Sequence, residues 1–145
     1  MKNNKNILIA FTLLLGLISC RKDIIVPDKE FENLFGTWNW VSSSGGFGGE
    51  TITPTTESKT IEIEYKENGT YKKFIDDKKV SKMTFQFEEQ ESIYSIGKEY
   101  VITYSDGKFS RKGVISHPFD FIGTDTLILR DECYDCYSHI YVRKE

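Results

Sequence analysis

The sequence has no excess of basic charge, few histidines and no long helical pattern. Its 19 Lys and Arg residues stand against 22 Asp and Glu residues, so the basic stripe of a nucleic-acid-binding protein is missing. There are only two histidines, and no recognisable nucleophile accompanies either of them in the sequence. No segment has the sustained 3.6-residue apolar period of a long helix. We therefore expect no nucleic-acid partner, no cofactor, no metal site and no catalytic site, and we do not expect an enzyme.

Aromatic and apolar residues are plentiful instead. They make up 14% and 39% of the 145 residues, respectively, which is the composition of a folded chain and not of a disordered one. The length suits a single domain.

The first nineteen residues have the organisation of an export signal. Lys2 and Lys5 form a short basic region, and an apolar run follows over residues 7–18. A transmembrane helix needs about 20 apolar residues, whereas the apolar part of a signal peptide needs about 7–15. We therefore expect a signal peptide over residues 1–19, a tether over residues 20–27 and one domain over residues 28–145.

The end of this segment, Leu17-Ile18-Ser19-Cys20, resembles the bacterial lipobox. The resemblance implies that the chain is cleaved before Cys20 and that Cys20 carries the lipid. Arg21 and Lys22 follow, where many inner-membrane lipoproteins have Asp, so the resemblance implies a lipid-anchored envelope protein at the outer membrane. Its orientation there stays open. The alternative is an ordinary signal peptide with an incidental cysteine.

Short strand signals follow one another along the rest of the chain. Asp28 is placed to cap a helical turn in which Phe31, Leu34 and Phe35 share one apolar face. Apolar and polar residues then alternate over short segments. The predicted strands are residues 37–43, 61–65, 70–75, 83–87, 99–105, 108–116, 126–131 and 137–143.

Tight turns join these strands. Asn68-Gly69 predicts a type I′ hairpin turn, and Asp76-Asp77 and Asp106-Gly107 predict two more. Pro118 is expected to end the strand before it, because proline cannot donate to a strand ladder.

Consecutive hairpins make sequential antiparallel neighbours, and no helical stretch is available for a parallel crossover. The predicted fold is all-β: an antiparallel up-and-down barrel of eight to nine strands with a short N-terminal helical turn. Closure removes exposed edges, and an eight-stranded barrel holds packed side chains or one small ligand. A β-sandwich is the alternative.

The longest predicted connection is residues 42–59, which are rich in Gly, Ser and Thr. Long loops in compact domains are often functional. One interpretation is a mobile lid over the mouth of the barrel, with Phe47 and Ile52 as its apolar contacts. The other is an ordinary flexible loop.

The helical turn, the Gly36-Thr37-Trp38 motif behind it and Arg143 at the end of the last strand resemble the small bacterial lipocalin-like lipoproteins of the lipocalin (calycin) superfamily. The resemblance implies that Trp38 plugs one end of the barrel and that Arg143 packs over its indole. Such a cation–π pair contributes about 0.5–2 kcal/mol, and it would tie the first strand to the last.

Cys133 and Cys136 lie in a predicted hairpin turn and in an oxidising compartment. A turn brings Cα atoms three residues apart within about 7 Å, near disulfide reach, so we predict a disulfide. His139 extends the pattern to C-x-x-C-x-x-H, which could contribute three zinc ligands, but no fourth ligand is evident.

Aromatic residues share faces on two predicted strands. Tyr137, His139 and Tyr141 lie on one face of the last strand, and Tyr100 and Tyr104 on one face of another. Facing inward, they would line an apolar pocket with polar groups that orient a ligand. The alternative is a filled core or a covered outer face, since a one-residue register slip reverses the faces.

Two functional hypotheses of different classes result. The first is binding or carriage of a small hydrophobic molecule, with Phe47 and these five strand residues as candidate ligand contacts. The second is an envelope interaction module with a filled barrel, whose loops contact a protein or glycan partner.

Overall fold

The structure is a computed structural model that describes residues 24–106 and 115–145. Within these ranges there are two short helices, the 3₁₀ helix η2 (Lys29–Leu34) and α2 (Pro54–Glu57). The strands are β1 (Gly36–Gly45), β2 (Glu50–Ile52), β3 (Ile61–Tyr65), β4 (Thr70–Ile75), β5 (Lys78–Glu91), β6 (Lys98–Ser105), β7 (Ile115–Ile122), β8 (Thr126–Arg130) and β9 (Tyr137–Arg143).

Some of the sequence predictions concern residues outside these two described ranges. The signal peptide over residues 1–19, the lipidation site Cys20 and the sorting residues Arg21 and Lys22 lie outside the described residues. So do Gly107 of the Asp106-Gly107 turn and nearly all of the strand predicted over 108–116.

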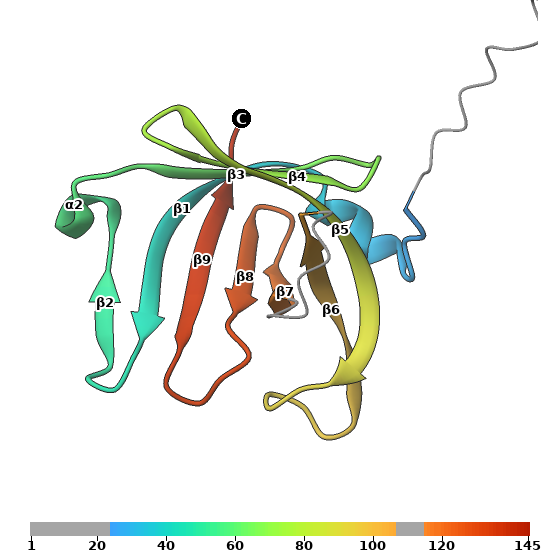
Figure 1. The fold of residues 1–145 in the computed structure, drawn as a ribbon. Helices are drawn as coiled ribbons and strands as arrows, with labels where there is room; N and C mark the ends of the chain where they lie inside the picture. Colours follow the sequence, from blue (N-terminus) through green and yellow to red (C-terminus); the bar gives the residue numbers. More distant parts are fainter. Residues whose placement is uncertain (1–23, 107–114) are drawn as a thin grey trace, which may run out of the picture.

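Eight strands form a closed antiparallel barrel with one extra strand (Figure 1). Neighbours pair in the order β1-β3-β4-β5-β6-β7-β8-β9, and β9 pairs back onto β1. Along one edge of β1, the first residues pair with β3 and residues 43–45 pair with β2. The extra strand β2 thus covers a part of β1 that β3 does not reach, which leaves less unpaired edge. The predicted barrel is confirmed, and the sandwich is excluded.

The helical turn forms where the sequence predicts it. The Asp28 carboxylate accepts a hydrogen bond from the Glu30 N–H as the N-cap of η2. Phe31 packs on Phe87 and Phe119, with ring centroids 5.4 and 4.9 Å apart. η2 therefore lies against interior residues of β5 and β7 and fills that part of the barrel.

Trp38 and Arg143 join the first strand to the last. The Trp38 side chain has no exposed surface, and its indole N–H donates to the Leu34 carbonyl at 2.9 Å. Trp38 is the ladder partner of Arg143, whose guanidinium carbon lies 4.2 Å from the centroid of the indole ring. The expected cation–π contact is therefore present at the junction of β1 and β9.

The Arg143 guanidinium is also held by main-chain carbonyls. It donates to Asn33, to Phe35 at 3.0 Å and to Thr124 at 3.1 Å. Gly36 makes room for it: the residue has a φ of +133°, and a Cβ there would lie 2.8 Å from Nη1 of Arg143. The positive φ, which L side chains rarely adopt, and this close approach both favour glycine at this position of the motif.

The hairpin turns differ in type from the prediction. The Asn68-Gly69 hairpin exists, but only Gly69 has a positive φ, and its N–H donates to the Lys66 carbonyl at 2.9 Å. The type I′ prediction for Asn68-Gly69 is therefore wrong, because the turn begins earlier, at Lys66. The turn with two positive φ values, as type I′ requires, is Asp76-Asp77, with φ of 49° and 62°.

Pro118 does not break its strand. β7 runs from Ile115 through Pro118 to Ile122. Residues 115–118 pair with β6 and residues 119–122 pair with β8. Pro118 sits at the end of the first ladder, where a missing donor is tolerated.

The predicted loop over residues 42–59 is largely regular structure. β1 continues to Gly45, β2 returns over three residues, and α2 follows behind a capping box of Thr53 and Thr56. The serines and threonines of this segment serve as strand and cap residues, so the loop interpretation was wrong in this part.

Candidate functional site

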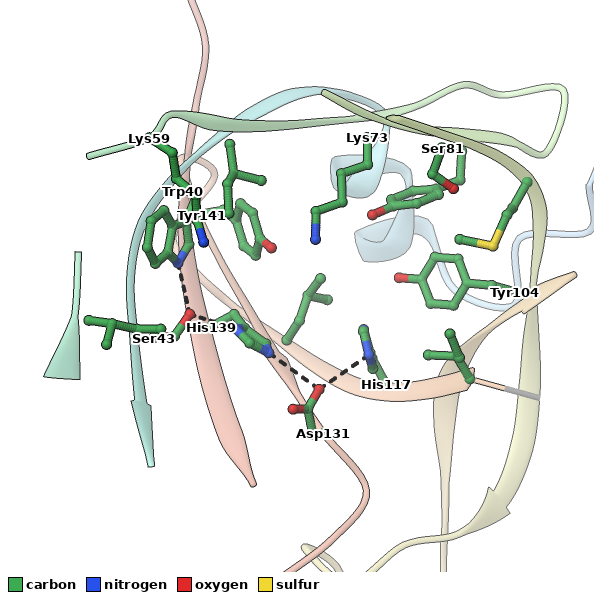
Figure 2. Close-up of a pocket in the computed structure, with 16 residues that line it drawn as sticks. Trp40, Ser43, Lys59, Lys73, Ser81, Tyr104, His117, Asp131, His139 and Tyr141 are labelled. Atoms are coloured by element: carbon green, nitrogen blue, oxygen red, sulfur yellow. Dashed lines mark hydrogen bonds and ion pairs between the residues drawn. The ribbon is translucent and has the colours of Figure 1, made fainter. Parts of the chain in front are cut away.

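A cavity of about 440 Å³ lies inside the barrel (Figure 2). Its wall includes four large aromatic residues, Trp40, Tyr71, Tyr104 and Tyr141, together with aliphatic side chains. This volume falls within the range of about 300–1,000 Å³ that is typical of small-molecule pockets. The barrel is filled near Trp38 and η2 and hollow here.

Three of the six predicted ligand contacts line the cavity. They are Tyr104 on β6 and His139 and Tyr141 on β9. Ile52, the second apolar residue proposed for the lid, lines it as well.

The other three predicted contacts lie elsewhere. Phe47 is at the turn between β1 and β2 with its side chain 98% exposed, so it does not cover the cavity. Tyr100 has the same strand parity as Tyr104 but lies nearer the start of β6, where it packs on Phe31 at 5.6 Å between ring centroids. The Tyr137 ring lies beside Gly46 instead. Strand parity identified the face of these residues but not their depth along the barrel.

A chain of hydrogen bonds follows one side of the cavity (Figure 2). The Trp40 indole N–H donates to Ser43 Oγ at 2.8 Å, and Ser43 Oγ lies 2.6 Å from His139 Nδ1. An indole N–H can only donate, so Ser43 Oγ accepts from it. A hydroxyl can accept a second hydrogen bond as well as donate one, so the direction of the contact between Ser43 and His139 depends on the tautomer of the imidazole. On the other side of the ring, His139 Nε2 lies 3.3 Å from Oδ1 of Asp131. An ionised carboxylate can only accept, so the imidazole is the donor in this contact.

Asp131 makes two further polar contacts. His117 Nε2 lies 3.4 Å from its Oδ1, and the Tyr137 N–H donates to Oδ2 at 3.4 Å. The hydrogen bond with His139 makes the largest contribution to the lowered pKa of Asp131. Burial lowers the pKa of His117 to about 4 and outweighs the opposing effect of Asp131, so His117 is neutral at pH 7.

The fold therefore gives His139 a hydroxyl partner that the sequence analysis missed. Ser43 lies 96 residues away along the chain and is its ladder partner across the β1–β9 junction. The order Ser43, His139, Asp131 is that of a nucleophile, a base and an orienting acid. However, Ser43 is only 2% exposed and already accepts the Trp40 N–H, which favours a role in positioning His139 and joining the two strands.

Lys73 is the second residue that sequence reasoning missed. It follows Tyr71 by two positions on β4, so the same parity places both side chains on the inner face. Its ladder partners are Ile63 on β3 and Ser81 on β5. Figure 2 shows the Lys73 ammonium pointing into the cavity. Burial makes the largest contribution to the lowered pKa of Lys73. In the sequence, the two-residue spacing between Tyr71 and Lys73 could have indicated that both side chains share one face of the strand.

The cysteine pair lies beside this site. Cys133 and Cys136 form a disulfide with their Cα atoms 5.4 Å apart, in the turn between β8 and β9. The predicted cysteine pair thus lies at disulfide distance, and a disulfide takes up the thiols that the zinc alternative requires. The same turn carries Asp131, whose N–H donates to the Tyr137 carbonyl at 3.0 Å.

In the part of the chain that the structure describes, no helix has the length and apolar character needed to cross a membrane. Comparisons with models of known protein families, with curated proteins and with solved structures found no match for this chain.

Proposed function

We propose that the protein is a lipid-anchored envelope lipoprotein whose lipocalin-like barrel binds or carries a small hydrophobic molecule. The observation that carries this proposal is the aromatic-walled cavity of about 440 Å³. The alternative is an interaction module with a filled barrel, and a cavity of this size does not agree with a filled barrel. The junction of Gly36, Trp38 and Arg143 supports the lipocalin-like interpretation, since the motif residues make the contacts that the resemblance implies.

Filling the cavity should abolish binding. Ser81 lines it, and its neighbour Lys82 is exposed on the opposite face of β5. With N-phenyl-1-naphthylamine, a neutral apolar fluorophore, we expect saturable binding to the wild-type chain. Ser81→Phe should weaken it about tenfold or more, the factor that corresponds to 1.4 kcal/mol, and Lys82→Phe should leave it unchanged.

The titration would use the whole chain in phospholipid nanodiscs, with empty nanodiscs subtracted. Absence of saturable binding to the wild type would overturn the proposal. Equal weakening by both substitutions would also overturn it, because the probe would then be reporting on something other than the interior.

The lipid anchor has its own test. Each buried CH₂ of an acyl chain contributes about 0.8 kcal/mol, and two or more chains anchor a protein stably. In a bacterial host, the wild-type chain should sediment with the membranes, and Cys20→Ser should move the protein to the soluble fraction. Cys133→Ser is the control, since it removes a cysteine of the barrel and should leave the protein on the membrane. A Cys20→Ser chain that stays with the membranes as the wild type does would contradict the anchor.

A further inference from the structure

We propose that the ligand of this cavity is a small apolar or aromatic monocarboxylate whose head group binds Lys73, Tyr71 and Tyr141. The inference rests on the proposed function and adds the chemical class of the ligand. Its basis is a cation and two hydroxyls that line one cavity without partners among the described residues.

Lys73 has no direct partner for its charge within the described part of the barrel. Asp131 on the same cavity attracts it and raises its pKa, but burial has the larger effect and lowers that pKa. No hydrogen bond or ion pair joins its ammonium to a residue in the described part of the chain. Its neighbour Lys72 shows the contrast: it faces outward and pairs with Glu64 at 2.7 Å. Lysine is rarely placed on an inner face without a partner, because a desolvated charge costs free energy unless it is paired.

The other charged residues at the cavity already have polar contacts. Lys59 pairs with Glu57 at 2.7 Å. Asp131 is engaged by His117, by His139 and by the Tyr137 N–H. Lys73 is therefore the cation of the cavity wall that is available to an anionic ligand.

Two hydroxyls add donors for an anionic head group. Tyr71 and Tyr141 line the cavity, and neither hydroxyl has a hydrogen bond to any residue in the ranges described. Burial raises the pKa of both phenols far above neutrality, so each remains an O–H donor. Figure 2 shows the Tyr141 hydroxyl and the Lys73 ammonium both turned into the cavity. By contrast, the hydroxyls of Tyr65 and Tyr104 are bonded to each other.

The balance of charge selects a monoanion. One unpaired cation faces the ligand, and the Asp131 carboxylate borders the same cavity. A phosphate monoester carries about −1.5 to −2 charges at pH 7, which exceeds what a single lysine offsets and would be repelled by Asp131. A carboxylate matches the cation, and Trp40 and Tyr104 supply the wall for an apolar body.

The test compares three probes that share one ring system: 2-naphthoate, neutral 2-naphthalenemethanol and 2-naphthyl phosphate. Isothermal titration calorimetry would use the whole chain in nanodiscs, with empty nanodiscs subtracted. We expect the wild type to bind 2-naphthoate about tenfold more tightly than the alcohol, as a charge-assisted hydrogen bond implies, and more tightly than the phosphate.

Variants assign this preference to one side chain. Lys73→Met should remove the roughly tenfold preference for the carboxylate and keep the affinity for the alcohol, which also reports that the barrel is folded. Lys73→Gln is the second variant, to be used if the methionine variant does not fold. Lys72→Met, which removes an outward charge, should leave the preference intact.

The outcomes separate the two proposals. Equal affinity of the wild type for the acid and the alcohol would overturn the carboxylate inference and leave apolar binding standing. Tighter binding of the phosphate would overturn it too, as would loss of the preference in Lys72→Met. Failure of the wild type to bind either the acid or the alcohol would overturn the proposed function and, with it, this inference.

Discussion

Trp38→Ala is expected to lower the free energy of unfolding by about 3–5 kcal/mol, the usual cost of removing a fully buried large aromatic side chain. The indole has no exposed surface, donates to the Leu34 carbonyl and lies under the Arg143 guanidinium. The substitution removes packing, a hydrogen bond and a cation–π partner together, at the point where β1 meets β9.

Urea denaturation followed by far-ultraviolet circular dichroism measures this loss. Val41→Ala is the matched control, since this β1 residue is exposed and surface substitutions usually change stability by less than about 0.5 kcal/mol. If Trp38→Ala cost no more than the control, the β1–β9 junction would not be a main source of the stability of the barrel.

Acidification from pH 6.5 to pH 4 is expected to destabilise the fold by about 3 kcal/mol through His117, at about 1.4 kcal/mol for each pKa unit. Burial lowers the pKa of His117 from 6.5 to about 4 in the folded chain. Between these pH values the unfolded chain takes up a proton that the folded chain does not, so unfolding becomes more favourable as the pH falls. The full stability is present above pH 6.5.

Asp131 acts in the same direction at lower pH. Its folded pKa lies below the ordinary value, first through the hydrogen bond with His139. The stability that this carboxylate contributes is present above its unfolded pKa and is lost as the pH falls through its folded pKa. Both members of the pair therefore make the site sensitive to acid.

The acid effect can be assigned by substitution. His117→Gln cannot take up the proton, so its free energy of unfolding should change much less between pH 6.5 and pH 4.5 than that of the wild type. Urea titrations of both chains at these two pH values give the comparison. An identical pH dependence in the two chains would show that other groups cause it.

Part of the cavity wall departs from the apolar pattern of the barrel. Inward positions of the strands hold apolar and aromatic side chains almost throughout. The cavity wall adds polar side chains on these strands: Ser43, Lys73, Ser81, His117 and His139. Departures of this kind from local rules are expected at functional sites, where stability is given up for binding.

The sequence alone predicted the helical turn at Asp28, the turn with the cysteine pair and all the described strands except β2 and most of β7. The resemblance to the lipocalins supplied the Trp38–Arg143 pair. These features are local, or they follow from a motif at each end of the chain, and a period of two is visible in any short strand. The sequence also predicted which residues share a face, as with Tyr100 and Tyr104.

Only the tertiary structure decided which face is inside, how deep each residue lies and where the interior is hollow. Those properties depend on the register of strand pairing and on the closure of β1 onto β9, which brings Ser43 beside His139 across 96 residues. Tyr100 and Tyr104 share a face, yet one packs on η2 and the other lines the cavity. Alternation along one strand does not show how far a residue lies from either end of the barrel, because that distance depends on how all the other strands pair.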